Sequence, residues 1–135
     1  DHRDLHYPLR RQRQMCIRDR LDFAEKKTIR NAKLQINLAL NYGSKKEIVY
    51  AFNKLKKKRK ISENDIDNSL YTKNIPDPEI LIRTGNTQRL SNFLLWQAAY
   101  TEIFFEKKLW PDFKDKDLNK IVKKFSNIKR NFGKI

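Results

Sequence analysis

The sequence is poor in the residues that build disulfide-rich, metal-finger and fibrous proteins. It holds one cysteine, Cys16, so no disulfide can form within the chain, and its two histidines, His2 and His6, lack metal-finger spacing. Three glycines and four prolines exclude a collagenous or low-complexity chain. No apolar run approaches the roughly 20 residues that a membrane span needs. These absences favour a globular protein, which we expect in the reducing cytoplasm.

Positive charge is the main compositional excess. The chain carries 31 basic and 16 acidic residues, a formal net charge of +15, which predicts attraction to nucleic acids, anionic membranes or phosphorylated small molecules. Lysine also accumulates on surfaces that have no binding role. The densest run, residues 54–60, indicates either a polyanion contact or a solvated helix end beside the negative terminus of the helix dipole, and we favour the second interpretation.

The first 20 residues differ in composition from the rest. They contain six arginines and no lysine, and they show neither helical nor strand periodicity. We predict that residues 1–20 are a tail foreign to the fold, either an artefact of gene assembly or a disordered segment, and that the folded region is 21–135. Without the tail 25 basic and 13 acidic residues remain, a net charge of +12, so the basic character belongs to the folded region.

Strand and helix patterns alternate along the folded region. After a weakly helical stretch, alternating and β-branched residues predict a strand over residues 33–40. Ser44 is expected to cap a helix that runs to about Lys58 and buries one apolar stripe. The stripe comprises Ile48, Val49, Phe52 and Leu55.

The middle of the chain repeats this alternation. A capping box of Ser62 and Asp65 predicts a short helix to about Tyr71. Residues 79–83 are a short apolar run between prolines and a glycine, which predicts a buried strand. Residues 92–100 are almost wholly apolar and favour helix, with Ser91 as the expected N-cap.

The C-terminal part completes the pattern. Residues 101–105 predict a strand, residues 109–113 predict a turn, and a final helix carries an apolar stripe. That stripe comprises Leu118, Ile121, Val122, Phe125, Ile128 and Phe132. Alternating strands and helices predict an α/β protein with a mainly parallel sheet flanked by helices.

An anion site is predicted where the strand over residues 79–83 ends. Arg83 stands at the carboxyl end of that strand, the edge where ligands bind parallel α/β sheets, and Arg89 and Ser91 follow in the loop. Guanidinium groups bind phosphate oxygens through paired donors, and a helix start adds free N–H groups. Taken one at a time, these residues have ordinary structural interpretations: Arg83 as an ion-pair partner, Arg89 as a solvated charge and Ser91 as a helix cap. Their grouping favours a diphosphate site.

Glu102 lies in a strand of apolar residues. A buried carboxylate there would need a partner or a metal ion, whereas an edge position would leave the carboxylate open to water, and the sequence leaves both interpretations open. Nearby aromatic side chains suit either a core or a subunit interface. These are Trp96, Tyr100, Phe104, Phe105, Trp110 and Phe113.

Several of these motifs occur together in a known family. The runs Ile82-Arg83-Thr84-Gly85, Gln88-Arg89-Leu90-Ser91-Asn92-Phe93-Leu94-Leu95-Trp96-Gln97, Ala99-Tyr100-Thr101-Glu102 and Leu109-Trp110-Pro111-Asp112-Phe113 resemble the C-terminal signature of the cis-prenyltransferases. Asn41-Tyr42-Gly43 resembles an upstream motif of the same family. The resemblance covers residues 21–135 in register.

The resemblance implies a homodimeric α/β enzyme. Such an enzyme adds isopentenyl diphosphate, with magnesium, to an allylic diphosphate such as farnesyl diphosphate, and it forms the cis-polyprenyl lipid carrier of cell-wall synthesis. By this resemblance Arg83, Arg89 and Ser91 bind the diphosphate of isopentenyl diphosphate, and Glu102 helps to hold Mg²⁺ across the dimer interface. Release of an apolar product implies transient contact with a membrane surface.

The chain departs from the family in two places. Asn86-Thr87-Gln88 stands where the family has Gly-Glu-His, and the N-terminal half, with the aspartate that serves the allylic diphosphate, has no counterpart here. We therefore expect a C-terminal fragment with an incomplete sheet, no catalytic aspartate and little activity alone. Two other hypotheses are a non-catalytic accessory subunit of a prenyltransferase and, ranked last, a nucleic-acid-binding module built on residues 54–60. We expect no nucleic-acid partner.

Overall fold

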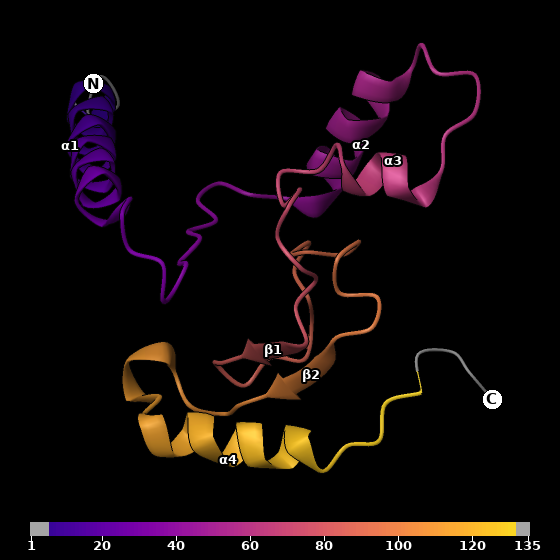
Figure 1. Cartoon of the computed structure of the whole chain (residues 1–135). Coiled ribbons are helices and arrows are strands. Elements are labelled where there is room, and N and C mark those ends of the chain that lie inside the picture. The colour runs from indigo at the N-terminus through magenta and orange to yellow at the C-terminus, as the bar shows by residue number, and fades with distance from the viewer. Residues whose placement is uncertain (1–5, 132–135) are drawn as a thin grey trace. The chain divides into compact units, whose positions relative to one another are not determined.

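A computed structural model describes residues 6–131, with side chains from Cys16 onward. The chain divides into two compact units, residues 1–39 and 40–135, which are described separately. The first unit contains one long helix, α1 (His6–Thr28), shown in indigo in Figure 1. Lys26 and Lys27 lie in its last turn, where cations favour the helix dipole. The helix continues through residue 20 without a break, and the predicted tail boundary stays a prediction.

Residues 33–40 do not form the predicted strand. The segment is irregular, and its alternating apolar side chains are exposed, with 74% of Leu34 and 73% of Ile36 open to solvent. A strand is stable only when its backbone N–H and C=O groups pair with a neighbour, and within residues 6–131 this segment has no ladder partner. The alternating pattern therefore indicated a local preference for strand, but no other strand within residues 6–131 pairs with this segment.

Helices α2 (Ser44–Leu55) and α3 (Glu63–Asp67) pack against each other in the second unit. The expected apolar stripe of α2 was wrong at Val49 and Phe52, which are exposed, whereas Ile48 and Leu55 are partly buried. The fully buried positions of α2 are Ser44, Glu47 and Ala51. Gly43, not Ser44, is the N-cap of α2. A small core joins the two helices. It comprises Ala51, Ile66 and Leu70, with Leu55, Ile61 and Trp96 packed around it.

The capping box of α3 is confirmed. The Ser62 side chain accepts a hydrogen bond from the Asp65 backbone N–H, and the Asp65 carboxylate accepts one from the Ser62 N–H at 2.9 Å. Lys58 forms an ion pair with the same carboxylate. The helix ends at Asp67, short of the expected end near Tyr71.

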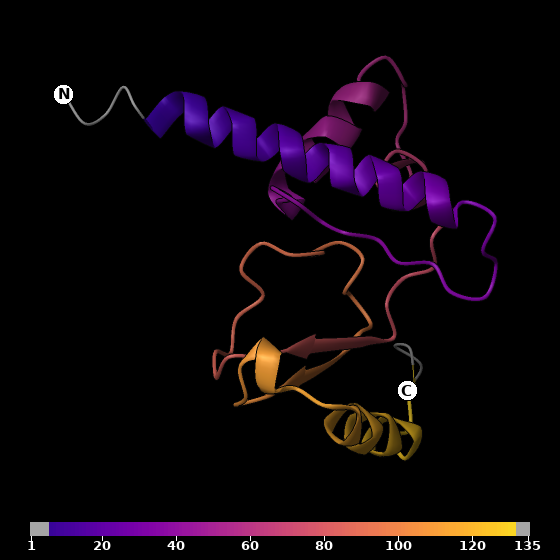
Figure 2. The ribbon, with the colours of Figure 1, turned by 90° about the vertical axis from the view of Figure 1, so that its left-hand side faces the viewer.

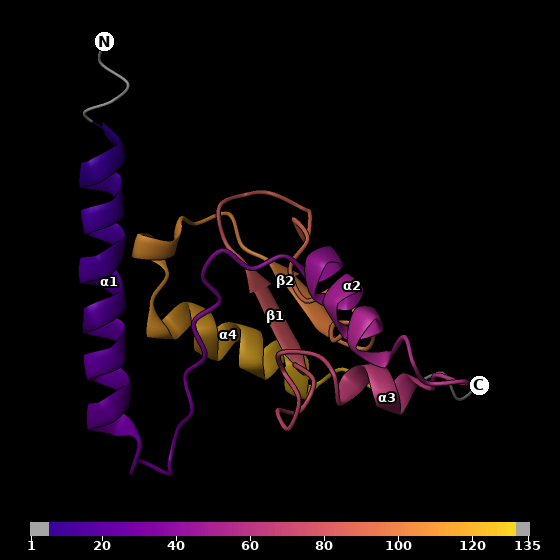
Figure 3. The same cartoon turned by 90° about the horizontal axis from the view of Figure 1, so that it is seen from above.

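Strands β1 (Ile80–Arg83) and β2 (Glu102–Phe105) form a parallel pair, which confirms the predicted α/β class with a parallel sheet. In the register Ile80 pairs with Glu102, and Arg83 pairs with Phe105. Figure 3 shows the two strands side by side. Thr101 donates a hydrogen bond to the Pro78 carbonyl at 2.6 Å, so the segments that enter the two strands are also joined.

Helix α4 (Asp115–Ser126) follows a 3-10 turn over Trp110–Asp112 and lies below the strand pair in the view of Figure 2, where the helix is seen nearly end-on. Ile121 is its buried residue, whereas Leu118 and Val122 are about half exposed, so the predicted stripe is only partly buried. Phe132, the last member of that stripe, lies outside the described residues. Lys108 and Asp117 form an ion pair of 2.6 Å that fixes the start of the helix to the segment after β2.

No helix within residues 6–131 is both long enough and apolar enough to cross a bilayer.

The capping box should make α3 sensitive to acid. Hydrogen bonds from Lys58 and from Ser62 lower the pKa of Asp65 to about 2, from an ordinary value of 3.8. Because the pKa of the folded state is depressed, the stabilisation is present above pH 3.8 and is lost as the pH falls toward about 2. NMR titration of the Asp65 carboxyl should show this midpoint.

Replacing the cap should have a local cost. Ser62→Ala should raise the pKa of Asp65 toward its ordinary value and lower the free energy of unfolding by about 1 kcal/mol. Ser126→Ala, which removes an exposed hydroxyl at the end of α4, is the matched control. Equal effects of the two substitutions on the Asp65 titration would contradict the capping assignment.

Candidate diphosphate site

Arg83 ends β1 and is fixed at one nitrogen only. Its Nε donates a hydrogen bond to Thr87 Oγ1 at 3.0 Å, and among the described residues its two terminal amino groups have no partner. The turn between Arg83 and Thr87 is anchored to the segment after β2, because Gly85 N–H donates to the Lys108 carbonyl and Asn86 N–H donates to the Glu106 carbonyl. Gly85 has a φ of 89°, a backbone conformation that favours glycine. The half-buried guanidinium is therefore held in place through Nε, and its two amino groups remain available as hydrogen-bond donors.

Arg89 and Ser91 both follow this turn and both are exposed. The predicted helix from residue 92 is absent, since residues 91–100 form a series of turns, and Ser91 is not a helix N-cap. Ser91, Asn92 and Leu94 have φ values of 50°, 62° and 45°, which no right-handed helix accepts. The helix-start N–H donors expected at Ser91 are thus not provided there.

Long-range hydrogen bonds explain why the helix does not form. Asn92 accepts two bonds from the first turn of α2, from Ser44 N–H to its carbonyl at 2.8 Å and from Lys45 N–H to its Oδ1 at 2.9 Å. Leu95 N–H donates to Ser44 Oγ at 3.0 Å. Each left-handed non-glycine residue costs about 1 kcal/mol or more, so these bonds must offset that cost.

Glu47 is the centre of a buried polar cluster that was not predicted from the sequence. Its carboxylate is fully buried and accepts hydrogen bonds from Tyr71 N–H at 2.8 Å, from Gln97 Nε2 at 3.2 Å and from the Tyr42 hydroxyl. Gln97 Nε2 also donates to Thr72 Oγ1 at 2.9 Å. The cluster joins α2 to the segment after α3 and to the turns after Ser91. One sequence signal could have revealed this cluster: Glu47 stands at helical spacing from Ser44 and Ala51 and follows the Asn41-Tyr42-Gly43 motif.

Glu102 lies at the other end of the strand pair from Arg83. It opens β2 opposite Ile80, whereas Arg83 closes β1 opposite Phe105, so the length of the strands, about 10 Å, separates the two side chains' backbone positions. Half-buried Glu102 lines a small pocket of about 320 Å³ with Tyr100, Lys129 and other residues. Arg130, at the same pocket, pairs with Glu79 at 3.0 Å.

The donor set for a metal ion is sparse. Over residues 6–131 the structure contains no cluster of three or more histidine, cysteine or acidic side chains that could hold one. Glu102 therefore belongs to no such cluster among the described residues. Mg²⁺ does not require one, because it is commonly bound through one or two carboxylates plus substrate phosphates.

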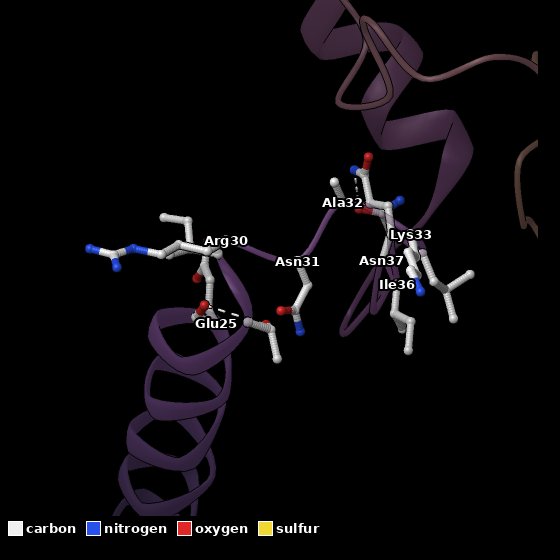
Figure 4. Close-up of a pocket in the computed structure, with 11 residues that line it drawn as sticks. Glu25, Arg30, Asn31, Ala32, Lys33, Ile36 and Asn37 are labelled. Carbon is white, nitrogen blue, oxygen red and sulfur yellow. Dashed lines mark hydrogen bonds between the residues drawn. The ribbon is translucent and has the colours of Figure 1, made fainter.

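A larger hollow, of about 1050 Å³, lies within the first unit between the end of α1 and the segment that follows. Figure 4 shows Glu25 and Arg30 at the helix end, with Arg30 extending away from Lys33 and Ile36. All of its lining residues are exposed, from Glu25 to Asn37. Because solvated side chains do not hold a ligand in a fixed geometry, we assign no site to this hollow.

The second unit is thus an α/β fold with Arg83 at the carboxyl end of a parallel strand. Comparison with known proteins makes the class specific. The family model "Putative undecaprenyl diphosphate synthase" matches residues 10–133. The chain belongs to this undecaprenyl diphosphate synthase family of isoprenyl transferases.

Individual relatives agree with the family match. The chain is 47% identical over 109 residues to an isoprenyl transferase of Rickettsia typhi, covering 79% of this chain and 48% of the relative. An isoprenyl transferase of Oceanobacillus iheyensis is 42% identical over 125 residues, with 87% of this chain and 50% of the relative covered. The chain therefore spans about half the length of the curated relatives it matches.

Two solved structures share the fold. The first is described as a "probable undecaprenyl diphosphate synthase (uppS) from Campylobacter jejuni", with a TM-score of 0.77, 37% identity, and 87% of this chain and 56% of the other covered. The second is lavandulyl diphosphate synthase from Lavandula x intermedia in complex with dimethylallyl diphosphate, with a TM-score of 0.79, 37% identity, and 87% and 54% covered.

The Glu47 cluster predicts a specific alkaline sensitivity. Burial, and then the hydrogen bond to Glu47, raise the pKa of Tyr42 above its ordinary value of 10.0. Because the folded-state pKa is raised, the phenol's contribution to stability is complete below pH 10.0 and is lost as the pH rises through the folded pKa. Urea unfolding from about pH 9 to about pH 11 should show the free energy of unfolding falling with pH.

The Tyr42→Phe variant should remove this contribution to the slope, because phenylalanine has no proton to lose. Tyr100→Phe, which changes an exposed tyrosine, is the control and should retain the slope. An unchanged slope in Tyr42→Phe would refute the role of the Tyr42 hydroxyl.

Proposed function

We propose that this chain supplies the donor-diphosphate part of a cis-prenyltransferase, an enzyme that condenses isopentenyl diphosphate with an allylic diphosphate such as farnesyl diphosphate. The observation that carries the proposal is Arg83, fixed through Nε at the carboxyl end of β1 with two amino groups available. Family membership supports the reaction class. The relative solved with dimethylallyl diphosphate supports an allylic diphosphate as a ligand of this fold.

The chemistry explains what these residues would contribute. In the condensation a carbon–carbon bond forms between the alkene of isopentenyl diphosphate and the first carbon of the allylic substrate, the allylic diphosphate leaves with its electron pair, and a proton is lost. Arg83, Arg89 and Ser91 would hold the donor's own diphosphate, so that its alkene is oriented toward the allylic carbon. Fixed guanidinium groups suit this task because they remain charged and bind oxygens in pairs.

The catalytic aspartate implied by the family resemblance has no counterpart in these 135 residues. We therefore propose that the chain binds the donor but has little or no prenyl-transfer activity alone. An accessory-subunit role would need the same donor site and would appear, on mixing with a full-length isoprenyl transferase, as activity above that of the full-length enzyme alone.

Magnesium is proposed as the cofactor, with Glu102 as one ligand. When bound, the ion would neutralise charge on a diphosphate. Glu102 and Arg83 stand at opposite ends of the strand pair, with backbone positions about 10 Å apart. This separation supports the proposed homodimer, in which Glu102 of one copy would serve the diphosphate held by the other.

The product of the proposed reaction would be a cis-polyprenyl diphosphate, the lipid carrier used in cell-wall synthesis. Its apolar chain suits transfer to a membrane surface, and the chain's net charge of +15 would favour contact with anionic headgroups. This contact would be transient and would not require insertion of the protein.

Substitution of the arginines tests the donor site. Arg83→Ala should weaken binding of isopentenyl diphosphate about tenfold or more, because charge-assisted hydrogen bonds to phosphate are worth roughly 1.5–3 kcal/mol. Arg89→Ala should act in the same direction. Isothermal titration calorimetry at constant ionic strength measures both affinities.

Arg59→Ala is the matched control, since it removes an exposed arginine of the basic run over residues 54–60. It should leave the affinity unchanged. If Arg59→Ala and Arg83→Ala weakened binding equally, only non-specific attraction would remain. Wild-type affinity in both Arg83→Ala and Arg89→Ala would also reject the proposal.

Glu102 provides a separate test of the magnesium proposal. Affinity for isopentenyl diphosphate should rise when Mg²⁺ is added to the wild-type chain and should respond much less in Glu102→Gln, which removes the charged ligand but keeps its shape. Glu63→Gln, an exposed change in α3, should behave as wild type. A full magnesium response in Glu102→Gln, with dimerisation verified by sedimentation velocity, would exclude Glu102 as a ligand.

A further inference from the structure

The turns that carry Ser91 have an unusual backbone. Ser91, Asn92 and Leu94 all have positive φ, although none of them is glycine. Such conformations persist only where the surrounding contacts determine them. In this structure those contacts come from the start of α2, a segment far earlier in the chain.

The first turn of α2 supplies the contacts. Every α-helix begins with backbone N–H groups that have no partner inside the helix, and Gly43, the N-cap of α2, provides no side chain to accept them. Asn92, which is distant in the sequence, accepts these N–H groups instead. Its carbonyl accepts a hydrogen bond from Ser44 N–H at 2.8 Å, and its Oδ1 accepts one from Lys45 N–H at 2.9 Å. We call these two bonds the Asn92 clamp.

Neighbouring contacts hold the same two segments together. Ser44, fully buried, accepts a hydrogen bond from Leu95 N–H at 3.0 Å. Tyr42 packs edge-on against Phe93, with ring centroids 5.6 Å apart. The approach is close enough that a Cβ added to Gly43 would lie 2.8 Å from Asn92 Nδ2. The clamp therefore belongs to a closely fitted contact between two segments, although Asn92 itself is exposed.

We propose that Asn92 is a positioning residue for the diphosphate site, which fixes the conformation of Ser91 by tying the next residue to the start of α2. This inference rests on the proposed donor-diphosphate function. Asn92 itself need not touch the substrate. Its amide suits the task for two reasons, since asparagine tolerates positive φ better than most residues and its Oδ1 is a good helix-cap acceptor.

Two substitutions separate the hydrogen bond from the backbone conformation. Asn92→Gly removes the Oδ1 acceptor but accepts positive φ without strain, and Asn92→Asp keeps both an acceptor and tolerance of positive φ. We expect Asn92→Gly to weaken binding of isopentenyl diphosphate and of inorganic pyrophosphate about tenfold, the scale of one lost hydrogen bond. Asn92→Asp should restore the affinity to within about twofold of wild type.

The matched control is Asn74→Gly, because Asn74 is also exposed and also has positive φ, 67°, but lies in the loop before β1. It should leave both affinities unchanged. Thermal unfolding of all three variants identifies any that do not fold at the temperature of the titration. A folded Asn92→Gly variant with wild-type affinity would overturn the inference.

A second readout does not depend on binding. The three-bond coupling between the amide and α protons reports φ at Ser91, and amide hydrogen exchange at Lys45 reports the clamp bond. Both should change in Asn92→Gly and be preserved in Asn92→Asp and Asn74→Gly. If the wild-type chain bound neither diphosphate, the proposed function would fail, while this readout would still decide whether Asn92 sets the backbone of Ser91.

Discussion

The second unit of the chain depends on one buried carboxylate. Glu47 has no exposed surface, and the three donors that satisfy it come from three separate places, namely the motif before α2, the segment after α3 and the turns after Ser91. An unpaired buried charge would be far too costly to retain, and even one lost partner costs about 1–3 kcal/mol. The cluster therefore requires these three segments to come together, and the small apolar core of Ala51, Ile66 and Leu70 forms beside it.

This requirement explains which elements could be predicted from the sequence. Strands β1 and β2 and the capping box of α3 were found because their signals are local: short β-rich runs between breakers, and two polar residues at the right spacing. The helix over residues 92–100 was predicted from equally local signals and was wrong, because Asn92, Leu95 and Gln97 form hydrogen bonds with residues of α2 that no short window contains.

The candidate site divides in the same way. Arg83, Arg89, Ser91 and Glu102 can be singled out from the sequence alone, because guanidinium, hydroxyl and carboxylate groups in those positions are informative by type. Their spatial relation was not accessible, since it follows from the strand register that places Arg83 and Glu102 at opposite ends of the sheet. The buried face of α2 was missed for a related reason, because the pattern ranked Val49 and Phe52 above a serine and a glutamate.

The unpaired segment over residues 33–40 has a consequence for how copies of the chain behave toward one another. From Leu34 to Leu40 the sequence has an aliphatic residue at every second position and no charge, proline or glycine, features shared with segments that stack into cross-β fibrils. Its aliphatic side chains are already exposed. Lys33 at its start and the large positive charge of the whole chain act against such stacking through mutual repulsion. The lysine-rich composition therefore opposes association between copies of the chain, independently of any ligand.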